Sequence, residues 1–497
     1  MNKLSKEIKK TLVSTLTTNG AKALSSALNA IVTLFGMIGA MRQKSEEEII
    51  AEFDKAWNEN QELALKMVFH ARNVRGGMGE RRTARILYKH LACIAPETIK
   101  KNLMYIPAFG RWDDLFVLID TPCEKDMFKL IKAQFNADMQ AVKVFEETGE
   151  QAEISLLGKW LKSCNTSSQE SRIIARKTMK HFKMREKEYR TSLAKLRDYL
   201  KVVESQISAG KWDSVYYAGV SSNAMSNYRN AFWRHDPERF AQYIGLLKQG
   251  HTKINSGTLF PYDILEKYGA RASRDGLGCS CNGYDTVLEE QWKALPNYID
   301  SDENVLILAD TSGSMNGRPL MTSLGLAIYF AERNKGAFKD LFMTFDRCPS
   351  FVQINGSSLK EKIESIKRID VANTNIEKAF DTLLKTAING SVPAEDMPKA
   401  LVIISDMQFD RASRNVFYHD LFAEKFAEAG YEMPNIIYWN VNAVNPVFHA
   451  TSDVKGVQMA SGSSPALFKS ILDNLGKTPL EAVLEVLNSD MYSMITL

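Results

Sequence analysis

The feature that most constrains the fold of this chain is an alternation of apolar runs and helical segments after residue 304. Four short runs are almost wholly apolar, and the first three end in aspartate: VLILAD (305–310), LFMTFD (341–346), ALVIISD (400–406) and NIIYWNV (435–441). Helical periodicity occupies segments between them, near 319–333 and 375–387. Continuous apolar strands alternating with helices are typical of a parallel sheet covered on both faces. We therefore predict an α/β doubly wound domain over residues 300–497.

The first part of the chain has a different pattern. Apolar residues recur at helical spacing, as in Leu63, Met67 and Ala71, and no clear run of alternating strands occurs before residue 290. Two segments echo each other, FGRWDDLF at 109–116 and AGKWDSVY at 209–216. Each places glycine, a basic residue, tryptophan and aspartate before an apolar helical run, which indicates stacked helix pairs. We predict an all-α domain over residues 1–290, followed by a boundary rich in glycine, serine and arginine.

Charge is divided unevenly between these two parts. Residues 1–300 hold 45 Lys and Arg against 35 Asp and Glu, whereas the remainder holds 18 against 24. A basic first part and an acidic second part indicate domains with different partners. The longest apolar stretch, residues 23–41, contains serines, an asparagine and glycines, so we predict a core helix and no membrane contact. Without an export signal, we expect a cytoplasmic protein.

Polar side chains gather where the predicted strands end. Asp310, Ser312 and Ser314 follow the first strand, Asp406 ends another, and Thr374 precedes a helix. Ligands of open α/β sheets lie beyond the carboxyl ends of the strands, so these five side chains could converge there. Two carboxylates and three hydroxyls suit Mg²⁺, a hard cation that prefers oxygen ligands. The alternative is that they only cap a helix and form turns.

The segments DTSGSM, NTN and SDMQFD resemble the metal-ion-dependent adhesion site of von Willebrand factor A domains. That resemblance covers roughly residues 300–485 and matches Asp310, Ser312, Ser314, Thr374 and Asp406. It implies a bound Mg²⁺ or Mn²⁺ whose coordination an acidic residue of a partner protein can complete. One departure is Asn373, which stands where the family usually has glycine.

The strongest basic segment runs from residue 159 to residue 201, with thirteen Lys or Arg against four acidic residues. Helical spacing places Arg172, Arg176, Lys180 and Lys183 on one face, with Lys177 beside them. A row of cations facing solvent is an electrostatic footprint for phosphates, and its alternative is an ordinary solvated face. A second cluster, RNVRGGMGERR (72–82), contributes Arg72 and Arg75. Those arginines could contact phosphates or pair with carboxylates.

The helical part resembles the TROVE (Ro ribonucleoprotein) superfamily, and is closest to TROVE-like fusions with a von Willebrand A domain in bacteria, viruses and plants. The segments that carry the resemblance are ARNVRGGMGERR (71–82), IPAFGRWDDLF (106–116), EYRTSLAKLRDYLKVVE (188–204), SNYRNAFWRHDPERF (226–240) and INSGTLFPYDIL (254–265). The resemblance implies HEAT-like helical repeats that bind single-stranded ends and structured non-coding RNA.

These observations predict an RNA-binding scaffold with a magnesium-dependent domain for partner contact. The rival interpretation is a metal-dependent protein-interaction or phage-structural assembly module without RNA. The histidines show no H-E-x-x-H or similar spacing and we find no Ser/His/Asp set, so we expect no enzyme; a metal hydrolase is a distant third hypothesis.

Overall fold

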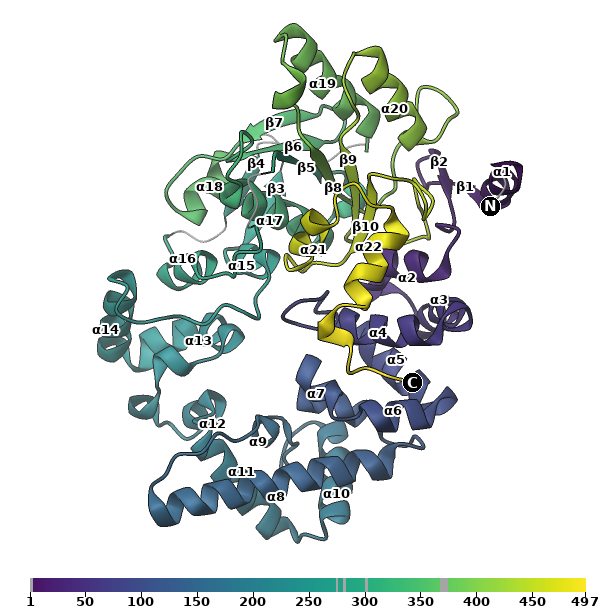
Figure 1. Ribbon diagram of the computed structural model, residues 1–497. Helices are drawn as coiled ribbons and strands as arrows, with labels where there is room; N and C mark the ends of the chain where they lie inside the picture. Colours follow the sequence, from purple (N-terminus) through teal and green to yellow (C-terminus); the bar gives the residue numbers. More distant parts are fainter. Residues whose placement is uncertain (1–2, 274–275, 280–282, 300–302, 367–373) are drawn as a thin grey trace. The chain divides into compact units, whose positions relative to one another are not determined.

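The computed structural model describes residues 3–497 except 274–275, 280–282, 300–302 and 367–373 (Figure 1). The chain forms two compact units, which are described separately. One comprises Met1–Thr83 and Ser256–Ser493 and is called the sheet unit. The other comprises Ala84–Asn255 and Met494–Leu497 and is called the helical unit. The compact units therefore cross the linear boundary that the sequence predicts between residues 290 and 300.

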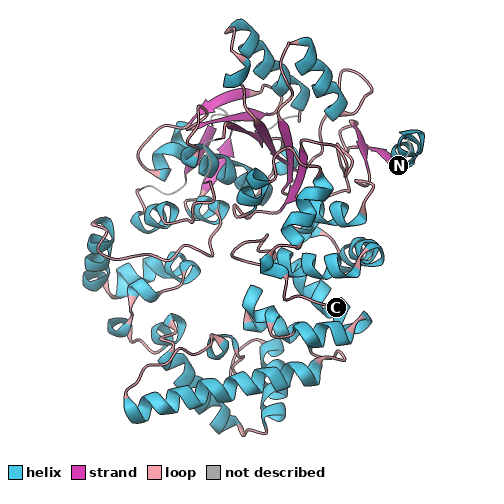
Figure 2. Cartoon of the chain, viewed as in Figure 1, coloured by secondary structure: helices cyan, strands magenta, loops and turns pink. Residues whose placement is uncertain are grey.

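A six-stranded sheet forms the centre of the sheet unit, in the order β10-β9-β8-β5-β6-β7. Its strands are β5 (Val305–Asp310), β6 (Leu341–Phe345), β7 (Ser350–Gln353), β8 (Ala400–Ser405), β9 (Asn435–Asn440) and β10 (Val457–Ser461). Neighbouring strands are parallel except β6 and β7, which pair antiparallel at one edge. Every residue of β5 and of β8 is buried, as expected for apolar strands covered on both faces. The predicted parallel α/β sheet is therefore confirmed (Figure 2).

Helices pack on the strands of this sheet. The helices of the sheet unit that follow residue 255 are α15 (Pro261–Lys267), α16 (Thr286–Lys293), α17 (Arg318–Arg333), α18 (Leu359–Ser365), α19 (Ile376–Asn389), α20 (Tyr418–Glu428), α21 (Leu467–Asp473) and α22 (Pro479–Leu487). Helix α17 contacts β5, β6 and β8, and thirteen of its residues are buried. A short antiparallel pair, β3 (Ala270–Ser273) and β4 (Gly276–Cys279), precedes α16.

The first 83 residues also belong to the sheet unit. They form α1 (Lys3–Leu12), an antiparallel hairpin of β1 (Ser14–Leu16) and β2 (Lys22–Leu24), α2 (Ala30–Ile38), α3 (Glu46–Glu59) and α4 (Gln61–Arg72). The predicted core helix of residues 23–41 is confirmed only over Ala30–Ile38, where eight of the nine residues of α2 are buried, because the stretch begins in strand β2. Helix α2 packs on β10, and a Cβ on Gly39 would lie 2.3 Å from the carbonyl oxygen of Ser461, so only glycine permits this approach. No helix in the described part of the chain is long and apolar enough to cross a membrane.

The helical unit is all-α in its described secondary structure. Its α-helices are α5 (Arg82–Ile94), α6 (Pro96–Asn102), α7 (Tyr105–Phe109), α8 (Glu124–Thr148), α9 (Leu157–Trp160), α10 (Gln169–Phe182), α11 (Glu186–Tyr199), α12 (Val203–Ser208), α13 (Ser222–His235) and α14 (Pro237–Lys248). Both echoed segments end a helix at glycine and continue into a 3-10 turn at the tryptophan, Trp112–Leu118 and Trp212–Ser214. Helices α10 and α11, which carry most of the basic segment, both pack on the long helix α8 (Figure 1).

Candidate functional site

Asp310 and Asp406 stand at the carboxyl ends of two neighbouring strands. Strands β5 and β8 pair in parallel with Ala309 opposite Ile404, so the residues that follow them meet at the same edge of the sheet. Both aspartates are buried, at 0% and 1% exposure. Because burying a charged carboxylate is costly, two buried carboxyl groups at the strand ends must either be neutral or be compensated by a positive charge.

Hydroxyl groups surround the two carboxylates. The Ser405 hydroxyl donates to Asp310 Oδ2, and the Ser312 N–H donates to Asp310 Oδ1 at 2.9 Å. The hydroxyl oxygens of Ser312 and Ser314 lie 3.2 Å apart. The structure thus brings Ser312 and Ser314 to the aspartate end of β5, as the sequence predicts.

The Asp406 loop connects this cluster to Thr374. The Gln408 N–H donates to Asp406 Oδ1 at 3.0 Å, and the Asp410 N–H donates to the Thr374 carbonyl oxygen at 2.9 Å. Thr374 is 1% exposed. Its neighbour Asn373, the departure from the family pattern, lies outside the described residues.

Both carboxyl groups are shifted toward the neutral form. Burial, reinforced by the charge of Asp406, raises the pKa of Asp310 to about 7. Burial also raises the pKa of Asp406, against the opposing hydrogen bond from the Gln408 N–H. Asp406 Oδ2 is buried and accepts no hydrogen bond from the described part of the chain. An orphaned carboxylate oxygen beside a second buried carboxylate is what a bound cation would satisfy.

The chemistry of the donor set fits a hard cation. Among the described residues no group of three or more His, Cys, Asp or Glu side chains is placed to hold a metal. Two carboxylates with hydroxyls match Mg²⁺, which retains water in its coordination shell. Asp310, Ser312, Ser314, Thr374 and Asp406 are the residues that would hold it, directly or through water.

Sequence reasoning did not include Ser405 and Gln408 in this cluster. The Ser405 hydroxyl also accepts a hydrogen bond from the Met407 N–H at 3.0 Å, so it ties Asp310 to the Asp406 loop. Ser405 could have been included, because it directly precedes Asp406 at the end of the strand. Gln408 could not, because no local sequence pattern marks it and its role depends on tertiary contacts.

The predicted cationic face lies on α10 of the helical unit. Ile174, Ala175, Thr178 and Phe182 form its buried side. Arg176 and Lys180 are exposed on the opposite side, one turn apart. The prediction of one cationic helix face is therefore correct for the body of the helix.

Three residues that were predicted to lie exposed on this helix face are placed differently. Arg172 is half-buried and donates to the carbonyl oxygens of Thr166 and Ser167, at 3.1 and 3.3 Å. Lys177 pairs with Asp120 and Glu124, which compensates its charge. Lys183 lies just past the helix, where a backbone φ of 59° ends it, and its side chain is exposed.

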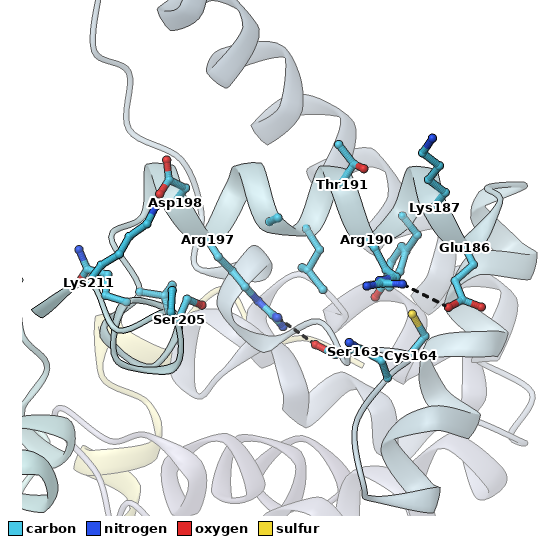
Figure 3. A pocket seen from close by; sticks show the side chains of 17 residues that line it. Ser163, Cys164, Glu186, Lys187, Arg190, Thr191, Arg197, Asp198, Ser205 and Lys211 are labelled. Atoms are coloured by element: carbon cyan, nitrogen blue, oxygen red, sulfur yellow. Dashed lines mark hydrogen bonds and ion pairs between the residues drawn. The ribbon is translucent and has the colours of Figure 1, made fainter. Parts of the chain in front are cut away.

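A groove opens beside this basic segment, along α11. It has a volume of about 870 Å³ and is lined by α11, α12 and the loop at residues 163–165 (Figure 3). Lys187, Arg190, Arg197 and Lys211 line it, against Glu186 and Asp198. The Arg197 guanidinium donates hydrogen bonds to the carbonyl oxygens of Gly158 and Leu161 and to the Ser163 hydroxyl. These bonds fix its positive charge at the side of the groove.

The other predicted arginine cluster is split. Arg75 is exposed, but Arg72 is only 2% exposed, inside the sheet unit at the end of α4. The expectation of a surface contact at Arg72 therefore needs correction, because all nine residues from Ala64 to Arg72 of α4 are buried by packing within the sheet unit. Gly77 makes the tight turn that follows, since a Cβ there would lie 2.1 Å from the His70 carbonyl oxygen.

Comparison with known proteins places the chain in a family. A family model described as "Domain of unknown function (DUF2828)" matches residues 17–134 and 125–303, which together span more than half of the chain. The chain belongs to the DUF2828 family. A second model, "Domain of unknown function (DUF7788)", matches residues 304–491 of this DUF2828 protein. The two matches meet between 303 and 304, close to the linear boundary that the sequence predicts, although the compact units are arranged differently.

Two similar proteins accompany this assignment. The DUF2828 protein is 27% identical over 511 residues to "Uncharacterized protein L728" of Acanthamoeba polyphaga mimivirus, covering 95% of this chain and 86% of the relative. Among solved structures, the Ro (RSR) protein of Deinococcus radiodurans matches with a TM-score of 0.45 and 13% identity, over 89% of this chain and 98% of that one. In the DUF2828 protein the carboxylate cluster of Asp310 and Asp406 lies in the DUF7788 match, and the predicted cationic face of α10 lies in the DUF2828 match.

Proposed function

We propose that this protein is an RNA-binding scaffold with a magnesium site for partner contact. The observation that carries the RNA assignment is a set of exposed cations on α10 and on the turn into α11. The set comprises Arg176, Lys180, Lys183 and Arg185 and is called the cationic row. None of the four forms an ion pair with any residue that the structure describes, whereas the neighbouring Lys177 and Lys195 are paired.

Unpaired cations on a rigid helix favour a polyanionic ligand. Each phosphate that they neutralise releases condensed counterions, which drives binding at ordinary salt concentrations. The adjoining groove, with Lys187 and Arg190 directly after the row, offers a concave path for an unpaired strand. The sequence resemblance to TROVE proteins favours RNA, in particular single-stranded ends, over an acidic protein as the ligand.

The test is a charge reversal with a matched control. Arg176, Lys180 and Lys183 are changed together to glutamate, and binding of a single-stranded RNA is measured as a function of salt. Loss of three phosphate contacts should flatten the log–log salt slope by about 2. In the control, Lys89, Lys385 and Lys469, which are exposed and scattered over the chain, are changed to glutamate. It makes the same change in net charge and should leave the salt slope mostly unchanged.

Two results would contradict the RNA assignment or its location. Absence of RNA binding by the unmodified protein at low salt would exclude an RNA-binding scaffold. An equal loss in both triple variants would mean that net charge, rather than the cationic row, determines binding.

The metal site is the second part of the proposal. Asp310, Ser312, Ser314, Thr374 and Asp406 would hold Mg²⁺, or Mn²⁺ in its place, and the ion would supply a positive charge at the edge of the sheet. Asp310 and Asp406 would supply two carboxylates, and an acidic group of a partner protein could complete the coordination. We assign the sheet portion to a von Willebrand A-like domain, the helical portion to a TROVE-like HEAT array, and no catalytic role to either.

The rival function is a metal-dependent protein-interaction module without RNA. It is favoured by the carboxylate cluster alone, which needs no nucleic acid. Nuclease treatment and the absorbance ratio of the freshly purified protein separate the two functions, because only an RNA-binding scaffold should carry nuclease-sensitive material.

A further inference from the structure

The tip of the N-terminal hairpin makes a dense set of contacts with the loop that carries Asp406. The tip comprises residues 17–20, between β1 and β2, and the loop comprises residues 406–410. Both lie in the sheet unit, although roughly 390 positions separate them in the sequence. Such contacts have no explanation in the hairpin itself, which already satisfies its own strand pairing.

Gln408 is the centre of these contacts. Its side-chain oxygen accepts hydrogen bonds from the Thr18 N–H at 2.8 Å and the Thr18 hydroxyl at 2.9 Å. Its carbonyl oxygen accepts from the Asn19 side-chain amide at 2.7 Å. Its N–H donates to Asp406 Oδ1 at 3.0 Å. A single residue therefore links the hairpin tip to a carboxylate of the proposed metal site.

Two further contacts extend this link to the other side of the loop. The Thr17 hydroxyl donates to the Phe409 carbonyl oxygen at 2.6 Å and accepts from the Ala21 N–H at 2.8 Å. Gly20 forms a β-bridge with Asp410, and the Asp410 N–H donates to the Thr374 carbonyl oxygen at 2.9 Å. The hairpin tip thus contacts the residues that are hydrogen-bonded to Asp406 and to Thr374.

The loop needs such support because its backbone is strained. Met407 has a φ of 66°, a conformation that a residue with a side chain rarely adopts. From within the fold, Ser405 and His449 hold Met407: its N–H donates to the Ser405 hydroxyl at 3.0 Å, and its carbonyl oxygen lies 3.1 Å from His449 Nε2. The hairpin tip holds the next two residues. The loop is fixed only while both sides are present.

We propose that the hairpin tip positions the Asp406 loop and thereby sets the divalent-cation affinity of the carboxylate cluster. This inference rests on the metal part of the proposed function. It assigns the hairpin at residues 14–24 a role in the site: the hairpin is a positioning element, and it does not contact the cation. A partner or protease that removes the hairpin from the loop would weaken the site from a distance.

The experiment removes the tip's side-chain donors and leaves the hairpin intact. Thr18→Val with Asn19→Ala deletes the hydroxyl and amide bonds to Gln408. The matched control is Thr15→Val, on the same hairpin, whose side chain makes no hydrogen bond to the described residues of the loop. Calorimetric titration with Mn²⁺ should give an affinity roughly three- to tenfold weaker in the double variant and unchanged in the control. Gln408→Ala should produce a loss that is not additive with that of the double variant.

A second measurement does not need the cation. In the presence of chelator, backbone amides of residues 406–410 should exchange with deuterium faster in the Thr18/Asn19 variant than in the control, while those of β8 stay protected. Unchanged Mn²⁺ affinity and unchanged exchange would overturn the positioning role, even if Asp310 and Asp406 variants lose the cation. Absence of Mn²⁺ binding by the unmodified protein would overturn the metal site itself and this inference with it.

Discussion

Replacing Asp310 and Asp406 together by asparagine should stabilise the metal-free protein and abolish its response to Mg²⁺. Burial and the neighbouring carboxylate raise the pKa of Asp310 from 3.8 to about 7, and burial raises the pKa of Asp406 as well. A carboxyl group whose pKa is higher in the folded state than in the unfolded chain costs stability as the pH rises from about 4 to about 7.

The magnitude follows from that shift. About three pKa units at Asp310 correspond to at most about 4 kcal/mol of lost stability at pH 7.5. Asparagine keeps the shape but weakens the hydrogen bonds from Ser405 and Ser312, each a loss of about 1 kcal/mol. We therefore expect the double variant to be more stable than the unmodified protein by about 1–3 kcal/mol in chelator at pH 7.5. At pH 4 it should be less stable by about 1–2 kcal/mol, because the charge cost is absent and the weaker hydrogen bonds remain.

The assay is denaturant unfolding with chelator and with Mg²⁺. The unmodified protein should gain about 2.7 kcal/mol when Mg²⁺ is 100-fold above its dissociation constant, and the variant should gain nothing. Asp396→Asn with Asp473→Asn, which changes two exposed carboxylates, should keep the Mg²⁺ response. A double variant that still responds to Mg²⁺ would place the cation elsewhere, and one that unfolds more easily in chelator would refute the repulsion argument.

The remaining predictions concern buried histidines and a tight turn. Burial lowers the pKa of His70 and of His449 to about 4, so the unfolded chain takes up protons that the folded chain resists, and stability should fall as the pH drops from about 6.5 to about 4. Urea midpoints at pH 7 and pH 5 measure this loss, and His449→Phe should reduce it. Gly77→Ala should lower the free energy of unfolding by about 2–4 kcal/mol, because its Cβ would overlap the His70 carbonyl oxygen. Thermal unfolding measures this loss, with Gly245→Ala, at a helical position with open space, as the control.

Local patterns were sufficient for four of the six strands and for the cluster at their carboxyl ends, but β7 and β10 were not predicted. The apolar runs that end in Asp310 and before Asp406 define β5 and β8, and the parallel pairing of these strands brings the two carboxylates together without further information. Helical spacing likewise identified the buried and exposed sides of α10. These features depend on residues that are close in sequence, or on the general rule for parallel sheets.

Features that depend on distant contacts could not be predicted. Nothing near Thr18 indicates a partner at Gln408, because the pairing is decided by the packing of the whole sheet unit. Lys177 fits the pattern of the cationic face, yet its carboxylate partners come from a turn and a helix more than fifty positions earlier. Arg72 belongs to a helix that packs with α2 and α22, so its burial also follows from tertiary packing.

The discontinuity of the sheet unit has a consequence for biosynthesis. The hairpin at residues 14–24 is made before its bonding partners at 408–410, which follow only after residues 84–255 of the helical unit. Those residues can therefore fold during translation, while the hairpin and α2 lack their packing partners until β8, β9 and β10 exist. Long-range pairing of this kind slows folding, and the waiting segment is the part of the nascent chain that a chaperone would recognise.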